Sequence, residues 1–176
     1  FCDYSSAEYM TVAGGGKLTG NGLIEEFSND NSTLFMKGTL APGLSVGTIT
    51  AKVNVVNMLE TSSILQAELT STTSYDQFVV TDAGNPTTVN LDSDARAEVT
   101  PLNPETFTLK AGDIFDLIVA DDVDVSGGLP SLSFQGPEAA SFAGTLTEVA
   151  GTPEALRLTL TAAPLPAAQG TVVTVK

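Results

Sequence analysis

Apolar and polar residues alternate along several stretches of the chain. Between Thr48 and Met58, the apolar residues Ile49, Ala51 and Val53 are each separated by one polar residue. The stretch from Leu156 to Leu160, LRLTL, alternates more strictly than any other. A period of two is typical of a strand that buries one face. We therefore predict strands at these places.

Turn signals separate the predicted strands. Asn21-Gly22 is the dipeptide most typical of a two-residue hairpin, and Asp82 to Pro86 and Ser126 to Gly128 mark further breaks. Roughly a dozen short strands with turns every 8 to 12 residues, and no convincing helix, indicate an all-β fold. We predict a two-sheet antiparallel β-sandwich, either Ig-like or a jelly roll. No internal repeat of fixed period is visible.

The densest apolar run, Ile114 to Val119, is predicted to be a central strand. Its alternation sends Phe115, Leu117 and Val119 into the core and places Ile114 and Ile118 on the opposite face. Two isoleucines facing water would be unusual. Either a second sheet layer or another subunit covers that face, or the strand is buried on both sides.

Three segments follow from composition: an N-terminal arm with a triple-glycine hinge over 1–16, the sandwich over 17–163, and a Pro/Ala spacer with a β-prone C-terminal peptide over 164–176. The arm is alternatively a first strand followed by a loose turn, and the final peptide alternatively closes the sheet of its own domain. Either end is a candidate for pairing with another copy. The predicted assembly residues are Phe1, Tyr4, Tyr9, Ile114, Ile118, Val172, Val173 and Val175.

The net charge and the residue types of the chain exclude several classes of function. The chain has 21 acidic and 7 basic residues and a net charge of −14, which disfavours nucleic acid and anionic membranes as partners. No run approaches the length of a membrane span, so we expect no membrane insertion. There is no histidine, which excludes a Ser-His-Asp triad and histidine-bound zinc. We expect no enzymatic activity. The first residue is Phe, which fits either a mature secreted product or an excised fragment.

Aspartates gather near the Ile114 to Val119 run. Carboxylate oxygens are the ligands that calcium prefers, and acidic loops supply them. A sandwich could bring the 92–94 and 121–124 loops to the same end. The candidate metal ligands are therefore Asp92, Asp94, Asp121, Asp122 and Asp124. The other interpretation is that these are solvated turn residues that keep the surface negative and block edge pairing. No other cofactor is expected.

Residues 111–162 carry a family resemblance. AGDIFDLIVADDVDVSGGLPSLSF, followed by SFAGTL and EALRLTLTA, resembles the Ig-like domains of secreted bacterial adhesins and surface proteins. The resemblance implies an extracellular sandwich at the cell surface that serves spacing, adhesion or assembly. We expect a non-enzymatic extracellular structural subunit that self-assembles into a filament or sheath through strand exchange or arm docking. The alternatives are a calcium-assisted adhesin or carbohydrate-binding module, with polysaccharide or a cell surface as partner, and a phage or viral tail or decoration protein.

Overall fold

The computed structural model describes residues 9–25, 32–81, 84–102 and 109–164, and it is built almost entirely of short strands. These pair into three sheets, here called sheets A, B and C. A short 3₁₀ helix, η2 (Ala139–Ser141), is the one named helical element in the described residues. Sheet A contains β1 (Tyr9–Val12), β4 (Thr33–Met36), β7 (Val55–Met58), β11 (Thr88–Asp92) and β14 (Asp122–Gly127). Sheet B contains β2 (Lys17–Gly20), β5 (Thr39–Pro42), β8 (Ile64–Ser71), β12 (Arg96–Pro101) and β15 (Ser131–Phe134), with β9 (Ser74–Tyr75) paired to β8. Sheet C contains β3 (Gly22–Ile24), β6 (Thr48–Ala51), β10 (Gln77–Val80), β13 (Ile114–Ala120), β17 (Glu154–Ala162) and β16 (Ala143–Val149).

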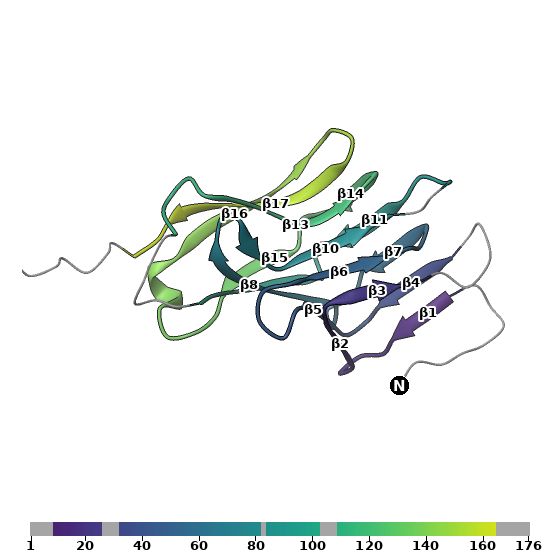
Figure 1. The fold of residues 1–176 in the computed structure, drawn as a ribbon, viewed down its shortest axis with the longest axis horizontal. Coiled ribbons are helices and arrows are strands. Elements are labelled where there is room, and N and C mark those ends of the chain that lie inside the picture. Colours follow the sequence, from purple (N-terminus) through teal and green to yellow (C-terminus); the bar gives the residue numbers. More distant parts are fainter. Residues whose placement is uncertain (1–8, 26–31, 82–83, 103–108, 165–176) are drawn as a thin grey trace, which may run out of the picture.

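The chain visits the sheets in the fixed order A, B, C and then begins again. Each circuit, here called a coil, lays one strand beside its predecessor in each sheet, except that β17 lies between β13 and β16 in sheet C, and the colours of Figure 1 follow this order along the chain. Sheet A is entirely parallel, sheet B is parallel except for the short pair of β8 with β9, and sheet C is parallel from β3 to β13. This is the topology of a β-solenoid, in which each coil contacts only its neighbours.

The predicted two-sheet antiparallel β-sandwich, Ig-like or jelly roll, is therefore wrong, although the chain is nearly all β as expected. Alternation of apolar and polar side chains indicates that a strand has one buried face. It does not indicate whether the neighbouring strands run parallel or antiparallel to it. Asn21-Gly22 illustrates the error. It joins β2 of sheet B to β3 of sheet C, so the turn is a corner between sheets and not a hairpin.

The core consists of columns of inward-facing side chains in register across the coils. In sheet A, Leu34 pairs with Val56, Val56 with Val89, and Val89 with Val123. All four are almost completely buried. Equivalent columns are Leu40, Leu65, Ala97 and Leu132 in sheet B, and Ile49, Phe78, Ile118 and Leu156 in sheet C. Each fully buried aliphatic or aromatic side chain contributes roughly 1.5–3 kcal/mol, so these columns dominate the stability of the fold.

Polar residues line the corner that leads from sheet C back to sheet A. Asn54 is buried there, and its side-chain oxygen accepts the backbone N–H of Ser32 at 2.9 Å. In the later coils the buried Thr87 donates its backbone N–H to the carboxylate of Asp121 at 3.0 Å. Because Asn54 occupies this corner, the predicted strand from Thr48 to Met58 is divided into β6 and β7, which belong to different sheets.

The next corner, from sheet A to sheet B, is built of small residues. Gly38 lies there against the first coil, so closely that a Cβ atom would meet the carbonyl oxygens of Gly16 and Ala13. In the following coil Ser63 is fully buried at this corner and donates its hydroxyl to the carbonyl of Met36 at 2.6 Å. Backbones of successive coils can approach this closely only where side chains are small.

A β-bulge corrects the prediction for Ile118. In β13, Asp116 pairs with Arg157 and Ile118 with Leu156, so Leu117 is an extra residue. Leu117 and Ile118 both become buried, and Ile118 is inward-facing instead of exposed. Ile114 lies before the bulge and keeps the predicted outward orientation, with 47% of its surface exposed.

Candidate interaction surfaces

The first coil presents an edge that is open in all three sheets. Among the described residues, β1, β2 and β3 each pair with one strand only, that of the second coil. Val12, Gly20 and Ile24 direct their carbonyls to that coil, where the N–H groups of Lys37, Gly43 and Lys52 bind them at 2.8–2.9 Å. Backbone direction alternates along a parallel strand. The N–H and C=O groups of the residues between, in particular Thr11, Thr19 and Leu23, therefore point away from the body. We call this row the open edge.

The opposite end of the molecule differs from the open edge, although its outermost described strands β14, β15 and β16 also pair with one strand each. In sheet C, β17 inserts between β13 and β16 and runs antiparallel to both. Glu154, the first residue of β17, accepts the backbone N–H of Val123 at 3.1 Å. Val123 lies on β14, the outermost described strand of sheet A, so Glu154 occupies a donor that a further strand would need. A backbone donor that is already bound cannot pair with another strand, so this part of β14 is less available for strand addition.

The two ends also differ in charge. Lys17, Lys37 and Lys52 lie in or beside the first two coils, where Glu25 is the acidic residue among those described. Lys52 pairs with Glu25 at 3.3 Å, and Lys37 with Glu60 of the third coil at 2.9 Å. The last coils contrast sharply, because they carry Asp121, Asp122, Asp124, Glu138, Glu148 and Glu154. Among the described residues, the first two coils therefore carry fewer acidic side chains than the last coils.

The predicted assembly residues do not form one surface. Tyr9 belongs to β1 at the open edge, is 48% exposed and packs edge-on against Phe35 with ring centroids 6.0 Å apart. Ile114 is exposed on β13, three coils away, and Ile118 is in the core. The remaining predicted assembly residues, Phe1, Tyr4, Val172, Val173 and Val175, lie outside the described residues.

The predicted metal ligands are separated by the parallel arrangement of β11 and β14. Asp121 and Asp122 lie where β14 begins, whereas Asp92 and Asp94 lie where β11 ends, at the other end of the same sheet. Asp92 accepts the N–H of Asp94 at 3.1 Å, and Asp124 accepts that of Ser126 at 2.7 Å, which lowers the pKa of Asp124. Within residues 9–25, 32–81, 84–102 and 109–164, no group of three or more His, Cys, Asp or Glu side chains is arranged to hold a metal ion.

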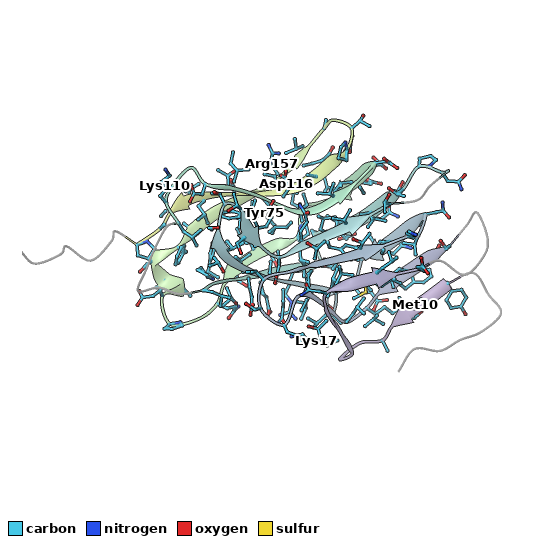
Figure 2. All side chains as sticks on the ribbon, viewed as in Figure 1. Met10, Lys17, Tyr75, Lys110, Asp116 and Arg157 are labelled. Carbon is cyan, nitrogen blue, oxygen red and sulfur yellow. The ribbon has the colours of Figure 1, made fainter. Side chains whose placement is uncertain are left out.

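A cleft of about 520 Å³ opens on the outer face of sheet B, and we call it the sheet B cleft. Its polar lining includes Lys17, Thr19, Gln66, Glu68, Glu98 and Gln135, from strands of the first coil through the last. Figure 2 labels Lys17 on the early coils, away from the Asp116–Arg157 pair. In the sequence, Gln66 and Glu68 alternate with Leu65, Ala67 and Leu69, and this period of two places both polar residues on the outward face of their strand. They could not indicate that Glu98, 32 residues after Gln66, lies beside it.

Asp76 is the buried carboxylate at the base of the sheet B cleft. Its Oδ1 accepts the backbone N–H of Gly47 at 2.7 Å, and its Oδ2 accepts that of Glu68 at 2.9 Å. Burial raises the pKa of Asp76 from its ordinary value of 3.8 to about 6, although the two N–H groups oppose this and only the charge of Glu68 adds to it. Asp76 thereby ties the start of β10 to both β8 and the loop before β6. No sequence motif marked it.

Two further observations bear on function. The described residues contain no helix long and apolar enough to span a bilayer. No family model matches the chain, and none of the curated proteins matches it either.

Proposed function

We propose that this protein is a non-enzymatic extracellular structural subunit that associates with a second copy of itself by strand addition at the open edge. The observation that supports the proposal best is the asymmetry of the two ends. One end exposes aligned backbone donors and acceptors on three parallel described strands, while at the other end β17 and β16 extend sheet C in antiparallel fashion and Glu154 occupies one donor of β14. An aligned row of unpaired backbone groups is a template for another strand.

The distribution of charge along the molecule also favours association through the first coil. Two copies of a chain with a net charge of −14 repel each other on average, and the repulsion is greatest where acidic side chains are dense. Contact through the first coil keeps the acidic last coils of the two copies far apart. The exposed Tyr9 and Leu23 beside the open edge add apolar surface that association would bury.

The number of ends through which each copy associates determines whether the assembly is a closed pair or a filament. With one associating end, two copies meet head to head and form a closed pair. A filament or sheath needs a second contact, for which the sequence offers the C-terminal residues Val172, Val173 and Val175, outside the described residues. Pairs would indicate that the open edge acts alone, and longer assemblies would indicate that the C-terminal peptide also engages a neighbour.

A single substitution tests the open edge. Thr11→Pro removes an N–H that points away from the body and leaves the hydrogen bonds between β1 and β4 intact, since proline is tolerated on an edge strand. Thr11→Ala is the matched control because it keeps the N–H. By sedimentation equilibrium, wild type and Thr11→Ala should pair, and Thr11→Pro should pair about tenfold more weakly or not at all. Wild type that stays monomeric at every concentration, or pairing by Thr11→Pro equal to that of Thr11→Ala, would contradict the proposal.

The extracellular location is a separate part of the proposal. It is supported by the resemblance of residues 111–162 to secreted surface proteins, whose implied sandwich fold the structure does not share. Antibody labelling of intact source cells tests it directly. Signal that appears only after the cells are lysed would contradict an extracellular location and leave the pairing proposal intact.

A further inference from the structure

One wall of the sheet B cleft is a chain of side-chain hydrogen bonds that crosses the sheet. The ammonium of Lys17 donates to Oε1 of Gln66 at 3.0 Å, and Nε2 of Gln66 donates to Oε2 of Glu98 at 3.0 Å. Lysine can only donate and a carboxylate can only accept, so this chain fixes the orientation of the Gln66 amide. Lys17 reaches Gln66 over Ala41, the small residue on the strand between them. The wall is thus built from three coils and held in place before any ligand arrives.

The remaining polar atoms of the cleft are mostly acceptors. Among the described residues, no hydrogen bond reaches the side-chain carboxylate of Glu68 or Oε1 of Glu98. Gln135 donates its amide N–H to Ser133 at 3.2 Å, which leaves its carbonyl oxygen to accept. A ligand that satisfies these groups must bring several donors of its own. Sugar hydroxyls are such donors, and they can accept from the protons of Lys17 that Gln66 does not use.

The charged side chains and the volume of the sheet B cleft restrict the class of ligand further. Glu68, Glu98 and Asp76 disfavour an anion, and the ammonium of Lys17 disfavours a cation beside Gln66, so a neutral molecule that donates hydrogen bonds to the acceptors fits best. The volume of about 520 Å³ lies within the range of small-molecule sites. We propose that the sheet B cleft binds a neutral, hydroxyl-rich saccharide through Glu68, Glu98 and Gln135. The cleft shares Lys17 and Thr19 of β2 with the open edge, but the three residues proposed to bind the saccharide lie in later coils.

Titration with defined oligosaccharides tests the proposal. The probes are cellohexaose, maltohexaose and mannohexaose, added to ¹⁵N-labelled protein while amide chemical shifts are followed. We expect at least one probe to shift the side-chain amides of Gln66 and Gln135. Glu98→Ala and Gln135→Ala should each weaken that binding about tenfold, which is the loss expected for one hydrogen bond to a fixed polar group. The matched control, Thr50→Ala on the outward face of sheet C, should bind as wild type does.

Several outcomes would overturn the proposal. They are the absence of shifts with all three probes, shifts that map outside the cleft, and binding by Glu98→Ala equal to that of the control. Spermidine or a galacturonic acid oligomer that binds the cleft as tightly as the best neutral probe would refute the charge argument. Thr11→Pro should bind the probe normally, so that a failure of pairing and a failure of saccharide binding are told apart.

Discussion

Acidification should stabilise this protein through Asp76. The folded-state pKa of Asp76 is about 6 and its ordinary value is 3.8, so the folded state binds the proton more tightly than the unfolded state does. The contribution of Asp76 to stability is therefore fully present below pH 3.8 and is lost as pH rises through about 6. A difference of this size corresponds to about 3 kcal/mol, of which about 2 kcal/mol should be gained between pH 7 and pH 4.

The substitution Asp76→Asn isolates this effect. Its amide oxygen can still accept one of the two N–H groups, from Gly47 or Glu68, and loss of the other bond should cost about 1–3 kcal/mol at every pH. The neutral side chain cannot titrate, so the extra stability gained on acidification should disappear. The net charge of −14 also falls on acidification, and this general relief is shared by both proteins. The difference between their pH slopes therefore belongs to Asp76.

Urea unfolding followed by far-ultraviolet circular dichroism measures these slopes, because the chain has no tryptophan to report by fluorescence. The titration should run from pH 7.5 to pH 4 at constant ionic strength. The hydrogen-exchange protection factors of the Gly47 and Glu68 amides, which correct for the intrinsic pH dependence of exchange, give a local measure of the same two hydrogen bonds and should rise at low pH in the wild type only. Equal pH slopes for wild type and Asp76→Asn would refute the reasoning.

Two further substitutions test the packing of the coils and the surface of sheet C. Gly38→Ala places a Cβ against the carbonyl oxygens of Gly16 and Ala13, so we expect a loss of about 1–3 kcal/mol in the urea-unfolding free energy. Gly84→Ala, where a Cβ meets nothing within 4 Å, is the control, and equal losses would contradict the close approach of the coils. Arg157→Met removes the two bonds to Asp116 at 2.6 and 3.0 Å, but both side chains are about a third exposed. The loss should be less than about 1 kcal/mol and should shrink further in high salt, and a loss of several kcal/mol would show that the pair is shielded from water.

The candidate surfaces were only partly predictable. The sequence placed Tyr9 in the N-terminal arm as an assembly residue, and the structure shows it half-exposed on β1 beside the open edge. It also placed Gln66 and Glu68 on the outward face of a strand. The open edge itself and the neighbours of Gln66 depend on which strands pair, and pairing partners from different coils lie far apart in the sequence. The sequence also could not show that Asp92 and Asp94, after β11, and Asp121 and Asp122, at the start of β14, lie at opposite ends of sheet A, because this follows from the parallel pairing of the two strands.

The sequence by itself determined where most of the strands lie and, apart from the part of β13 after its bulge, which face of the predicted strands is buried. The alternation from Leu156 to Leu160 is confirmed in β17, and the run beginning at Ile114 is confirmed as β13, because a period of two follows from strand geometry alone. Only the tertiary structure decided that the strands run parallel in coils. The coils differ in length: Ser32 and Asn54 meet 22 residues apart, Asn57 and Asn90 meet 33 apart, and Thr87 and Asp121 meet 34 apart. The corners between sheets vary in length from coil to coil, while the columns of inward-facing side chains stay in register. The structure therefore repeats although the sequence shows no fixed period.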